Sequence, residues 1–323
     1  MGFFFIQSSQ KRFTRRRALV ALSALLCAIF VFTSCSTRSA NVANGDARAE
    51  TREVVDGAGR RVRVPQRAER IITLAPNLTE IVYAVGAGPR LVGNTTFCDY
   101  PAEAKQVAKV GDTLHPSIER ILALRPQVIL VSTASQLEAF TRQLEEQHIA
   151  VYITDPHDLE GVFQSIEAIG DLLGERERAA SLVASLRART ASVEEKVKKE
   201  KPLSVFYQLS AEPLYTAGRD SFITDLVRRA GGISVTADVP GAWPRYSDEA
   251  ALAARPEAVI MATGDSMGAQ ANAEIAEPLK RSPAVLNNRV YKINGDYLSR
   301  PGPRLVDGLE QMARALHPEA FKE

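Results

Sequence analysis

The chain reads Ser117-Ile118-Glu119-Arg120-Ile121-Leu122-Ala123-Leu124-Arg125-Pro126 at one place and Ser247-Asp248-Glu249-Ala250-Ala251-Leu252-Ala253-Ala254-Arg255-Pro256 at another. The two segments align without a gap, and six of their ten positions are identical. Each has the pattern of a short helix, because Ser is a favourable N-cap, Glu suits the positive end of the first turn, and Arg-Pro stops the helix. An apolar strand follows each copy, at residues 128–131 and 258–261. The repeat therefore predicts two regions that are built alike.

The glutamate shared by the two copies has two interpretations. Glu119 and Glu249 can complement the dipoles of their helices and do nothing more. Alternatively, two similar lobes present matched carboxylates to a partner that itself has two similar subunits. The repeat alone leaves both interpretations open.

Short strands and helices alternate around the first copy. Residues 52–64 alternate around Asp56-Gly57-Ala58-Gly59, as a hairpin does, and Pro65 ends the pattern. Further along, we expect strands at 70–74, 91–93, 128–132 and 151–154, and helices at 78–85, 117–124 and 136–147. This order predicts an α/β lobe with a largely parallel sheet, whose ligands sit at the loops after the strands.

The same alternation returns after a purely helical stretch at residues 159–200, which predicts a stiff connector. We expect strands at 203–209, 258–262 and 290–293, helices at 220–230, 247–254 and 304–316, and a further element at 272–279. The fold class is therefore α/β, with two similar lobes of mainly parallel sheets. They span residues 52–157 and 202–323 and are joined by a long rigid helix within residues 158–201.

The first 34 residues have the pattern of an export signal. A basic start that ends in Arg15-Arg16-Arg17 precedes an apolar run at 18–32, which is too short for a permanent transmembrane helix. Phe32-Thr33-Ser34-Cys35 then resembles a bacterial lipobox, in which the cysteine sulfur is acylated and the chain is cleaved before it. We expect a signal peptide at 1–34, lipidation at Cys35 and a flexible tether at 35–51, with an ordinary secreted form as the alternative. The three arginines permit twin-arginine as well as general export.

Composition excludes several classes of partner. The chain has 323 residues, 45% of them hydrophobic and 24% charged, as in a globular protein with a substantial core. The net charge of +2 includes five basic residues in a leader without Asp or Glu, so the body is mildly acidic. Nucleic acid is therefore not an expected partner, since binding it needs a clustered basic face. Only Cys98 lies in the body, so no internal disulfide forms, and we expect a buried and inert thiol.

Signatures of catalysis are missing from the sequence. It has no Gly-x-Ser-x-Gly, P-loop, His-Glu-x-x-His or complete Gly-x-Gly-x-x-Gly motif. We therefore expect no enzymatic activity, no catalytic residue and no resident metal or cofactor. A hydrolase or chelatase and a structural envelope lipoprotein remain the alternative classes, although a structural protein would not need the matched glutamates.

Six segments of the body are distinctive, namely residues 70–80, Cys98-Asp99-Tyr100-Pro101, residues 118–126, Tyr215-Thr216-Ala217-Gly218, Trp243-Pro244 and Asp296-Tyr297-Leu298-Ser299-Arg300. With them the chain, from about Val54 to His317, resembles the substrate-binding proteins of ABC importers for metal chelates. Within that family the resemblance is greatest to the cobalamin-binding members. It implies a protein that captures a corrinoid between two lobes and delivers it to the membrane-subunit dimer of an ABC importer.

The resemblance also implies roles for individual residues. Glu119 and Glu249, one on each lobe, would dock on arginines of the paired membrane subunits. The walls and polar rim of the ligand site would be Tyr100, Tyr215, Trp243, Asp296 and Arg300. Without the resemblance, Trp243 would be interpreted as a half-packed loop residue. Asp296 and Arg300 would be interpreted as a surface ion pair. We expect a monomer on the periplasmic or cell-surface side, tethered to the membrane through its lipid.

Two positions depart from the cobalamin-binding pattern. The resemblance implies a Trp just ahead of the first docking glutamate and another after the following strand, where this chain has Thr113 and Val131. A ferric siderophore or haem is therefore the alternative ligand. Haem would need an axial His or Tyr, and His115 is the histidine near an expected binding loop. The histidines expected on the surface, which predict no metal site, are His148, His157 and His317.

Overall fold

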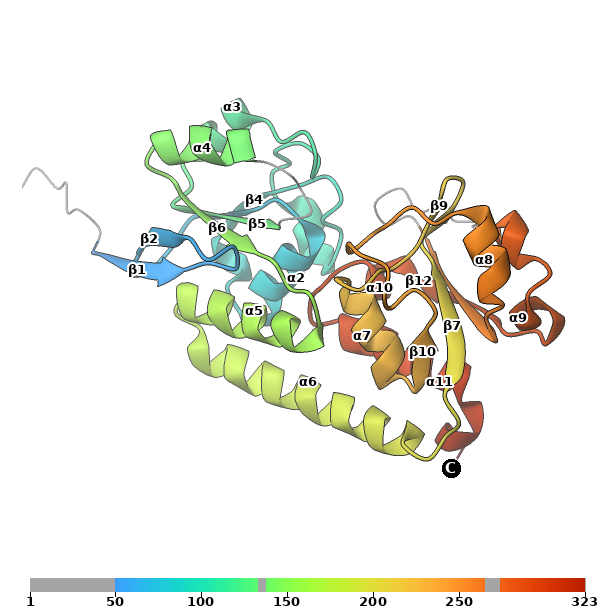
Figure 1. The fold of residues 1–323 in the computed structure, drawn as a ribbon. Coiled ribbons are helices and arrows are strands. Elements are labelled where there is room, and N and C mark those ends of the chain that lie inside the picture. The colour runs from blue at the N-terminus through green and yellow to red at the C-terminus, as the bar shows by residue number, and fades with distance from the viewer. Residues whose placement is uncertain (1–49, 133–137, 265–273, 323) are drawn as a thin grey trace, which may run out of the picture. The chain divides into compact units, whose positions relative to one another are not determined.

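The computed structural model describes residues 50–132, 138–264 and 274–322 (Figure 1). The predicted signal peptide, Cys35 and nearly all of the predicted tether lie outside the described residues. Residues Glu50–Glu323 belong to one compact unit.

An antiparallel hairpin opens this unit, with β1 (Thr51–Val55) paired to β2 (Arg61–Pro65). Asp56 fixes the turn between them, because its Oδ1 accepts hydrogen bonds from the backbone N–H groups of Ala58 and Arg60 at 3.0 and 2.9 Å. The hairpin predicted at residues 52–64 is therefore present, and it begins one residue earlier than expected.

Four parallel strands form the first sheet, in the order β4-β3-β5-β6. Nearly all of their side chains are buried, which explains why the sequence shows continuous apolar runs here rather than alternation. The strands are β3 (Ile71–Thr73), β4 (Leu91–Asn94), β5 (Val128–Ser132) and β6 (Ala150–Thr154).

The second sheet repeats this order with β10-β7-β11-β12, again all parallel. In both sheets the second strand in sequence takes the edge, followed by the first, third and fourth. This confirms the predicted α/β fold with two similar lobes and parallel sheets. The strands are β7 (Leu203–Gln208), β10 (Gly232–Ser234), β11 (Ala258–Thr263) and β12 (Val290–Asn294), and a small hairpin pairs β8 (Ser210–Ala211) with β9 (Leu214–Tyr215).

Helices cover both faces of the first sheet. The α-helices are α2 (Pro76–Ala84), α3 (Ile118–Ala123) and α4 (Glu138–Glu146), and the 3-10 turns are η1 (Gly88–Arg90) and η2 (Ala102–Gln106). α2 stops where predicted, because Gly86 adopts a φ of +87°, a backbone conformation that other residues rarely take.

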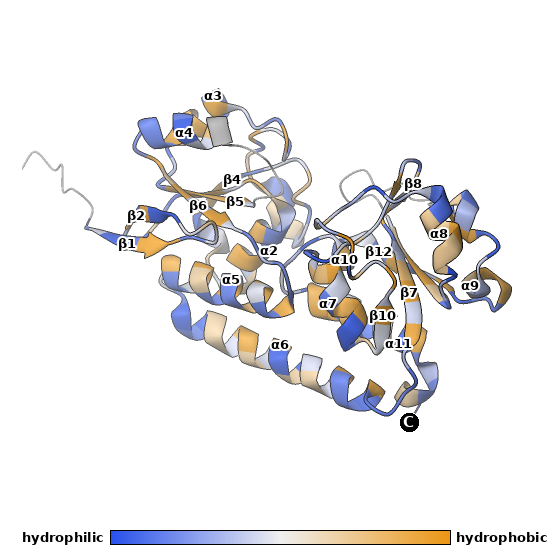
Figure 2. Cartoon of the chain, viewed as in Figure 1, coloured by the Kyte–Doolittle hydropathy of each residue, from blue (hydrophilic) through white to orange (hydrophobic). Residues whose placement is uncertain are grey.

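Two helices connect the lobes. α5 (Leu159–Leu172) and α6 (Arg176–Val197) run side by side (Figure 1). Figure 2 shows polar and apolar residues alternating along α6. Its buried positions recur every three or four residues, so a single stripe of this 22-residue helix faces the protein, at Ala179, Val183, Leu186, Thr190, Val193 and Val197. The long helix expected between the lobes is therefore α6.

The second lobe is covered by short helices on one face of its sheet and by longer ones on the other. The α-helices are α7 (Phe222–Arg229), α8 (Asp248–Ala254), α9 (Pro283–Leu286), α10 (Gly295–Leu298) and α11 (Leu305–Leu316), and the 3-10 turns are η5 (Glu277–Leu279) and η6 (Pro318–Phe321). Part of the element predicted at 272–279 lies outside the described residues.

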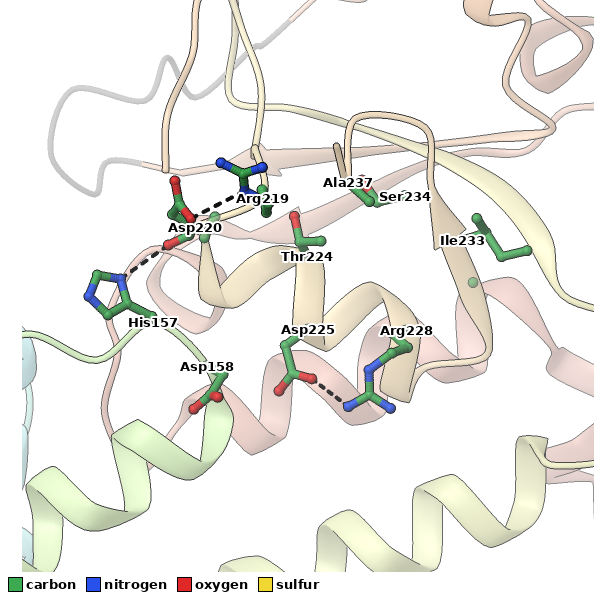
Figure 3. Close-up of a pocket in the computed structure, with 12 residues that line it drawn as sticks. His157, Asp158, Arg219, Asp220, Thr224, Asp225, Arg228, Ile233, Ser234 and Ala237 are labelled. Atoms are coloured by element: carbon green, nitrogen blue, oxygen red, sulfur yellow. Dashed lines mark hydrogen bonds and ion pairs between the residues drawn. The ribbon is translucent and has the colours of Figure 1, made fainter. Parts of the chain in front are cut away.

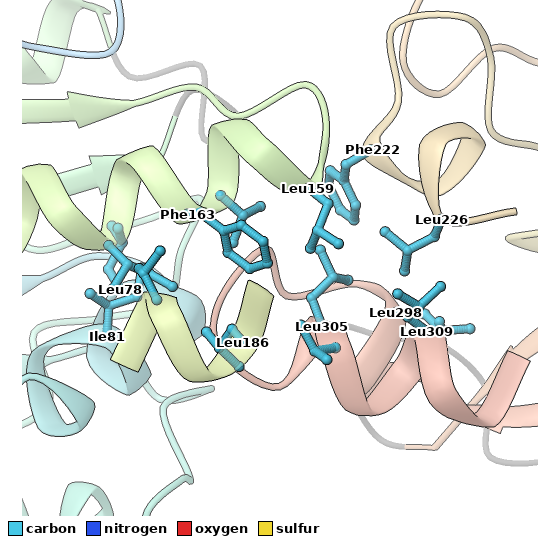
Figure 4. Packing of buried hydrophobic residues seen from close by; sticks show 14 of the residues in the cluster. Leu78, Ile81, Leu159, Phe163, Leu186, Phe222, Leu226, Leu298, Leu305 and Leu309 are labelled. Carbon is cyan, nitrogen blue, oxygen red and sulfur yellow. The ribbon is translucent and has the colours of Figure 1, made fainter. Parts of the chain in front are cut away.

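One continuous apolar core joins the two lobes. It includes Val128 of the first sheet, Ile166 and Val183 of the connecting helices, and Val205 and Ile260 of the second sheet. Figure 4 shows α2, α5, α6, α7 and α11 contributing side chains to it side by side. Two smaller cores lie on the other faces of the sheets, one under α3 and α4 and one under α8, α9 and η5. The connector is therefore a packed part of the fold.

Candidate functional site

All five residues predicted to bind ligand follow the carboxyl end of a parallel strand, where ligands of such sheets bind. In the first lobe, Tyr100 follows the edge strand β4. In the second lobe, Tyr215 lies in β9 after β7, Trp243 follows β10, and Asp296 and Arg300 follow β12.

Three carboxylates and two guanidinium groups meet between the lobes. We call this set the interlobe cluster, and its members are Glu80 of α2, Asp99, Asp296 of α10, Arg300 and Arg304. Arg300 Nη1 donates to Glu80 Oε1 at 3.1 Å and to Asp99 Oδ1 at 2.8 Å, and its Nη2 lies 2.9 Å from Asp296 Oδ1. Arg304 Nε and Nη2 donate to the two oxygens of Glu80 at 2.9 and 2.6 Å.

The centre of the interlobe cluster is buried. The side chains of Glu80 and Arg300 are 2% and 3% exposed, whereas that of Asp99 is 49% exposed. Asp296 and Arg300 are therefore not a surface ion pair, because Arg300 is enclosed by partners from both lobes. Burial by itself would raise the pKa of Asp99, but the hydrogen bond and charge of Arg300, aided by Arg304, hold that pKa below its ordinary value. Asp99 is thus a carboxylate at neutral pH.

Tyr100 is attached to the interlobe cluster through its ring. The guanidinium carbon of Arg304 lies 4.0 Å from the centroid of the Tyr100 ring and 5.4 Å from that of Tyr297. Both distances fall in the range of cation–π contacts. Tyr100 keeps 48% of its surface exposed, so one part of its ring is held by the cluster and another part is open to solvent.

Tyr215 and Trp243 form a second group in the C-terminal lobe. Their segments lie side by side, because Tyr215 bridges to Arg245 and the Thr216 N–H donates to the Pro244 carbonyl at 3.2 Å. The Trp243 ring packs edge-on against Phe222 at 5.6 Å between centroids and is half-buried. Within the described residues, no hydrogen bond or ring contact joins this group to the interlobe cluster.

The two positions that depart from the cobalamin-binding pattern are both buried. Thr113 is 6% exposed, and its hydroxyl has no hydrogen-bond partner among the described residues. Val131 is 2% exposed and lies inside β5, which continues to Ser132. Val131 therefore lies within the strand predicted at residues 128–132.

The two copies of the repeat form matching helices, α3 and α8. Ser117 Oγ accepts a hydrogen bond from the Arg120 N–H at 3.3 Å, and Ser247 Oγ accepts one from the Ala250 N–H at 3.1 Å, as predicted for N-caps. Glu119 and Glu249 occupy the first turns and are exposed. In the described part of the chain neither has an ion-pair partner, so both carboxylates are free to meet another molecule.

The lone thiol and the histidines are placed mostly as expected. Cys98 is buried, and the hydroxyls of Thr79 and Thr95 lie 3.1 and 3.2 Å from its sulfur. His148 and His157 are exposed, and so is His115, which pairs with Asp112. The expectation for His317 is wrong, because it is 6% exposed and its Nε2 lies 3.0 Å from the Gly231 carbonyl oxygen.

A pocket of about 510 Å³ lies beside α7, with His157 and Asp158 entering from the start of α5 (Figure 3). Most of its charged groups are paired, since Arg228 donates to Asp225 at 2.5 Å and Arg219 Nε lies 3.7 Å from Asp220 Oδ1. A lining of paired charges does not suit a flat, largely apolar chelate. The pocket contains none of the five predicted ligand residues, so it is not the predicted site.

The described residues contain neither a metal site nor a membrane-spanning helix. No three side chains among His, Cys, Asp and Glu come together there as a metal site. In the same residues no helix has the length and apolarity needed to span a membrane.

Comparison with known proteins identifies the family. The sequence profile described as periplasmic binding protein matches residues 71–297, from the first strand of the first sheet to α10. The chain belongs to the periplasmic binding protein family. The match includes both sheets and the connecting helices.

Individual relatives are similar over most of their length. The uncharacterised ABC transporter substrate-binding lipoprotein YvrC of Bacillus subtilis is 32% identical over 312 residues, which are 93% of this chain and 98% of YvrC. The vitamin B12-binding protein of Vibrio cholerae is 30% identical over 252 residues, 78% of this chain and 90% of that protein.

Solved structures with a similar fold are also periplasmic binding proteins. The periplasmic vitamin B12 binding protein BtuF of Vibrio cholerae has a TM-score of 0.69 at 28% identity, covering 80% of this chain and 100% of its own. A periplasmic heme binding protein from Pseudomonas aeruginosa also has a TM-score of 0.69, at 26% identity, covering 78% of this chain and 94% of its own.

Membership in this family fixes the class of function. The chain is a substrate-binding protein of an ABC importer, and such proteins deliver small chelate ligands to the importer's membrane subunits. The relatives are transport components, which confirms the prediction that the chain is not an enzyme. The predicted family and two-lobed fold are confirmed as well.

Sequence reasoning missed Glu80 and Arg304 as members of the site. The sequence held no signal for the burial of Glu80, because a charged residue between Leu78 and Ile81 has the pattern of a polar helix face, whereas the structure buries every residue from Pro76 to Val82. A carboxylate buried in this way requires a buried cation, and only the fold shows which one it meets.

Proposed function

We propose that the chain captures a corrinoid of the cobalamin type between its two lobes and delivers it to the membrane-subunit dimer of an ABC importer. The likeness to the vitamin B12-binding protein of Vibrio cholerae, over 90% of that protein's length, carries this proposal. It is supported by the position of the five predicted ligand residues after the carboxyl ends of strands.

In this proposal the exposed part of Tyr100, with Tyr215 and Trp243, supplies the apolar walls for the flat ring. Asp296 is the polar group proposed for the rim of the ligand, whereas Arg300, whose side chain is 3% exposed, supports that rim from behind. Most of the Arg300 guanidinium is already occupied by Glu80, Asp99 and Asp296, so it acts largely by orienting those carboxylates.

Glu119 and Glu249 are proposed as the two contacts with the transporter. They occupy equivalent positions of a repeat, are exposed, and carry a charge that complements arginines. A dimeric partner with a cation on each subunit would meet one glutamate from each lobe. Lipidation at Cys35 is proposed to hold the protein at the periplasmic or cell-surface side of the membrane, as the name of the lipoprotein YvrC supports.

Haem is the second candidate ligand. The heme binding protein from Pseudomonas aeruginosa has the same TM-score as the vitamin B12 binding protein, and this observation favours haem as the alternative to a corrinoid. Among the described tyrosines, Tyr100 combines a position after a strand with an exposed ring.

Native mass spectrometry of the purified body after incubation with cyanocobalamin, haemin and a ferric siderophore tests the proposal. We expect a one-to-one complex with cyanocobalamin and its visible absorption on the purified protein. Binding of haemin or the siderophore with no binding of cyanocobalamin would reject the corrinoid and leave the transport class intact.

A further inference from the structure

Glu80 has an environment that stability alone does not explain. It lies in α2, where all residues from Pro76 to Val82 are buried. Both of its carboxylate oxygens accept hydrogen bonds from arginines of the other lobe. Removing a carboxylate and its partners from water costs more than burying an apolar side chain of similar size. The ion pairs at Glu80 are therefore better explained by the fixed positions that they give to the two arginines than by a gain in folding stability.

The two arginines connect Glu80 to the residues at the exposed edge of the interlobe cluster. Arg300 holds Asp99 through Nη1, the same nitrogen that donates to Glu80. Arg304 uses Nε and Nη2 on Glu80 and lies with its guanidinium against the Tyr100 ring. Asp99 of the cluster and Tyr100, which contacts it through Arg304, are about half exposed, so a ligand can reach them.

We propose that Glu80 is a positioning residue of the ligand site: from the N-terminal lobe it holds Arg300 and Arg304 of the C-terminal lobe, and through them it fixes Asp99 and Tyr100 before the ligand arrives. The proposal rests on the proposed function in taking Tyr100 as a wall of the ligand site. Glu80 itself is too deeply buried to touch the ligand.

The exposed carboxylate of the cluster also indicates which ligand chemistry fits, since Arg300 Nε is the one guanidinium N–H group of the cluster found buried without a partner among the described residues. Arg300 Nη1 and Nη2 and Arg304 Nε and Nη2 already face carboxylates, and the exposed member of the cluster, Asp99, can only accept hydrogen bonds. A chelate whose rim donates hydrogen bonds, such as one bearing primary amides, matches this edge. A chelate bearing free carboxylates would meet a like charge.

Glu80→Gln tests the positioning role with little change in shape. The variant leaves two carboxylates facing two guanidinium groups, so neither arginine becomes an unpaired buried charge, and the fold should persist. Glu175→Gln is the matched control, because Glu175 makes an ion pair of 2.9 Å with Arg90 and has no contact with the interlobe cluster.

The first measurement is amide hydrogen exchange without any ligand. We expect Glu80→Gln to speed exchange in residues 95–101 and 296–304 and to leave the sheets unchanged, and Glu175→Gln to leave both segments unchanged. Unchanged exchange in the two segments, or faster exchange throughout the protein, would overturn the proposal. If Glu80→Gln does not fold, Arg304→Lys keeps the charge and loses the double hydrogen bond, and it should speed exchange in residues 95–101.

The second measurement is the affinity for cyanocobalamin. Glu80→Gln should weaken it at least about tenfold, Glu80→Asp should recover part of the loss, and Glu175→Gln should match the wild type. An unchanged affinity in Glu80→Gln would overturn the positioning role. Absence of binding in the wild type would instead reject cobalamin as the ligand, and the exchange measurement, which uses no ligand, would still decide the role of Glu80.

Discussion

Arg300 donates a hydrogen bond to Glu80 across 3.1 Å, although the two residues are 220 positions apart in the chain. Both side chains are almost completely buried. Because α2 lies in one lobe and Arg300 in the other, this pair ties the lobes together where the cluster's arginines contact the predicted ligand residues Tyr100 and Asp296. The link between the lobes and the positions of the predicted ligand residues therefore depend on the same charged side chains.

Acid should weaken this connection through Asp99. Its pKa in the folded protein lies below the ordinary value of 3.8, so its contribution to stability is complete above that value and is lost as the pH falls through the lowered pKa. Asp99→Asn should cost under about 1 kcal/mol at neutral pH, since half of the side chain is in water. Urea unfolding of both proteins should show this difference shrinking as the pH is lowered below 3.8. A difference that grows on acidification would contradict the assignment.

Trp243 should report ligand binding directly. It is the single Trp of the sequence, so quenching of its fluorescence by a chromophoric chelate has one source. Trp243→Ala should weaken binding by about 1 to 3 kcal/mol, as loss of a large buried contact does. Tyr246→Ala is the control, because Tyr246 lies in the same loop region but packs on Phe206, on the far face of the sheet. Equal affinity of Trp243→Ala and the wild type would remove Trp243 from the site.

Replacing both Glu119 and Glu249 with Ala should separate binding from transport. Ligand affinity and fold should be nearly unchanged, since each carboxylate in a first helical turn contributes only about 0.3 to 1 kcal/mol. Uptake should fall sharply, because truncating one side of a buried interfacial charge pair costs about 2 to 5 kcal/mol. Reversal to Lys should be worse than Ala.

Asp248→Ala provides the matched control for this experiment. Asp248 is exposed and occupies the same first turn of α8 as Glu249, so it interacts similarly with the helix dipole. It should support normal uptake. Full uptake by the Glu119→Ala, Glu249→Ala double variant would show that these glutamates act only within their own helices.

Gly308→Ala should destabilise the protein even though alanine favours helices. A Cβ at this position of α11 would lie well under 3.0 Å from the Tyr297 carbonyl oxygen, which is backbone and cannot rotate away. The gain of about 0.5 to 1 kcal/mol in helix propensity is smaller than the 1 to 3 kcal/mol or so that overpacking costs. Thermal unfolding measures the balance, with Gly161→Ala in α5 as a control, because a Cβ there would approach no atom closer than Asp158 Oδ1 at 3.2 Å. Stabilisation by Gly308→Ala would show that α10 and α11 can separate at no cost.

Cys35→Ser should release the protein from membranes or block its processing, because serine cannot form the thioether that carries the lipid. Fractionation of cells and the mass of the mature N-terminus check this. Unchanged cleavage together with unchanged membrane retention would exclude a lipid anchor at Cys35.

Much of the secondary structure followed from the sequence, because it depends on local periodicity. The strand predicted at residues 128–132 has those bounds, and the helices of the repeat begin at their predicted serine caps. β10 and α10 were not predicted, since elements of three and four residues are too short to show a period. α10 nevertheless carries Asp296 into the interlobe cluster.

The sequence by itself determined the alternation of strands and helices and the internal repeat with its serine-capped helices, because capping and apolar spacing act over a few residues. Only the tertiary structure decided that Arg300 is buried between the lobes, that Glu80 is its partner, and that His317 is inside the protein. Those outcomes depend on which side chains the sheet order and the packed connector bring together from distant parts of the chain. A charged residue has the same local pattern on a surface as in a buried ion pair, and its burial is set by partners that lie far away in sequence.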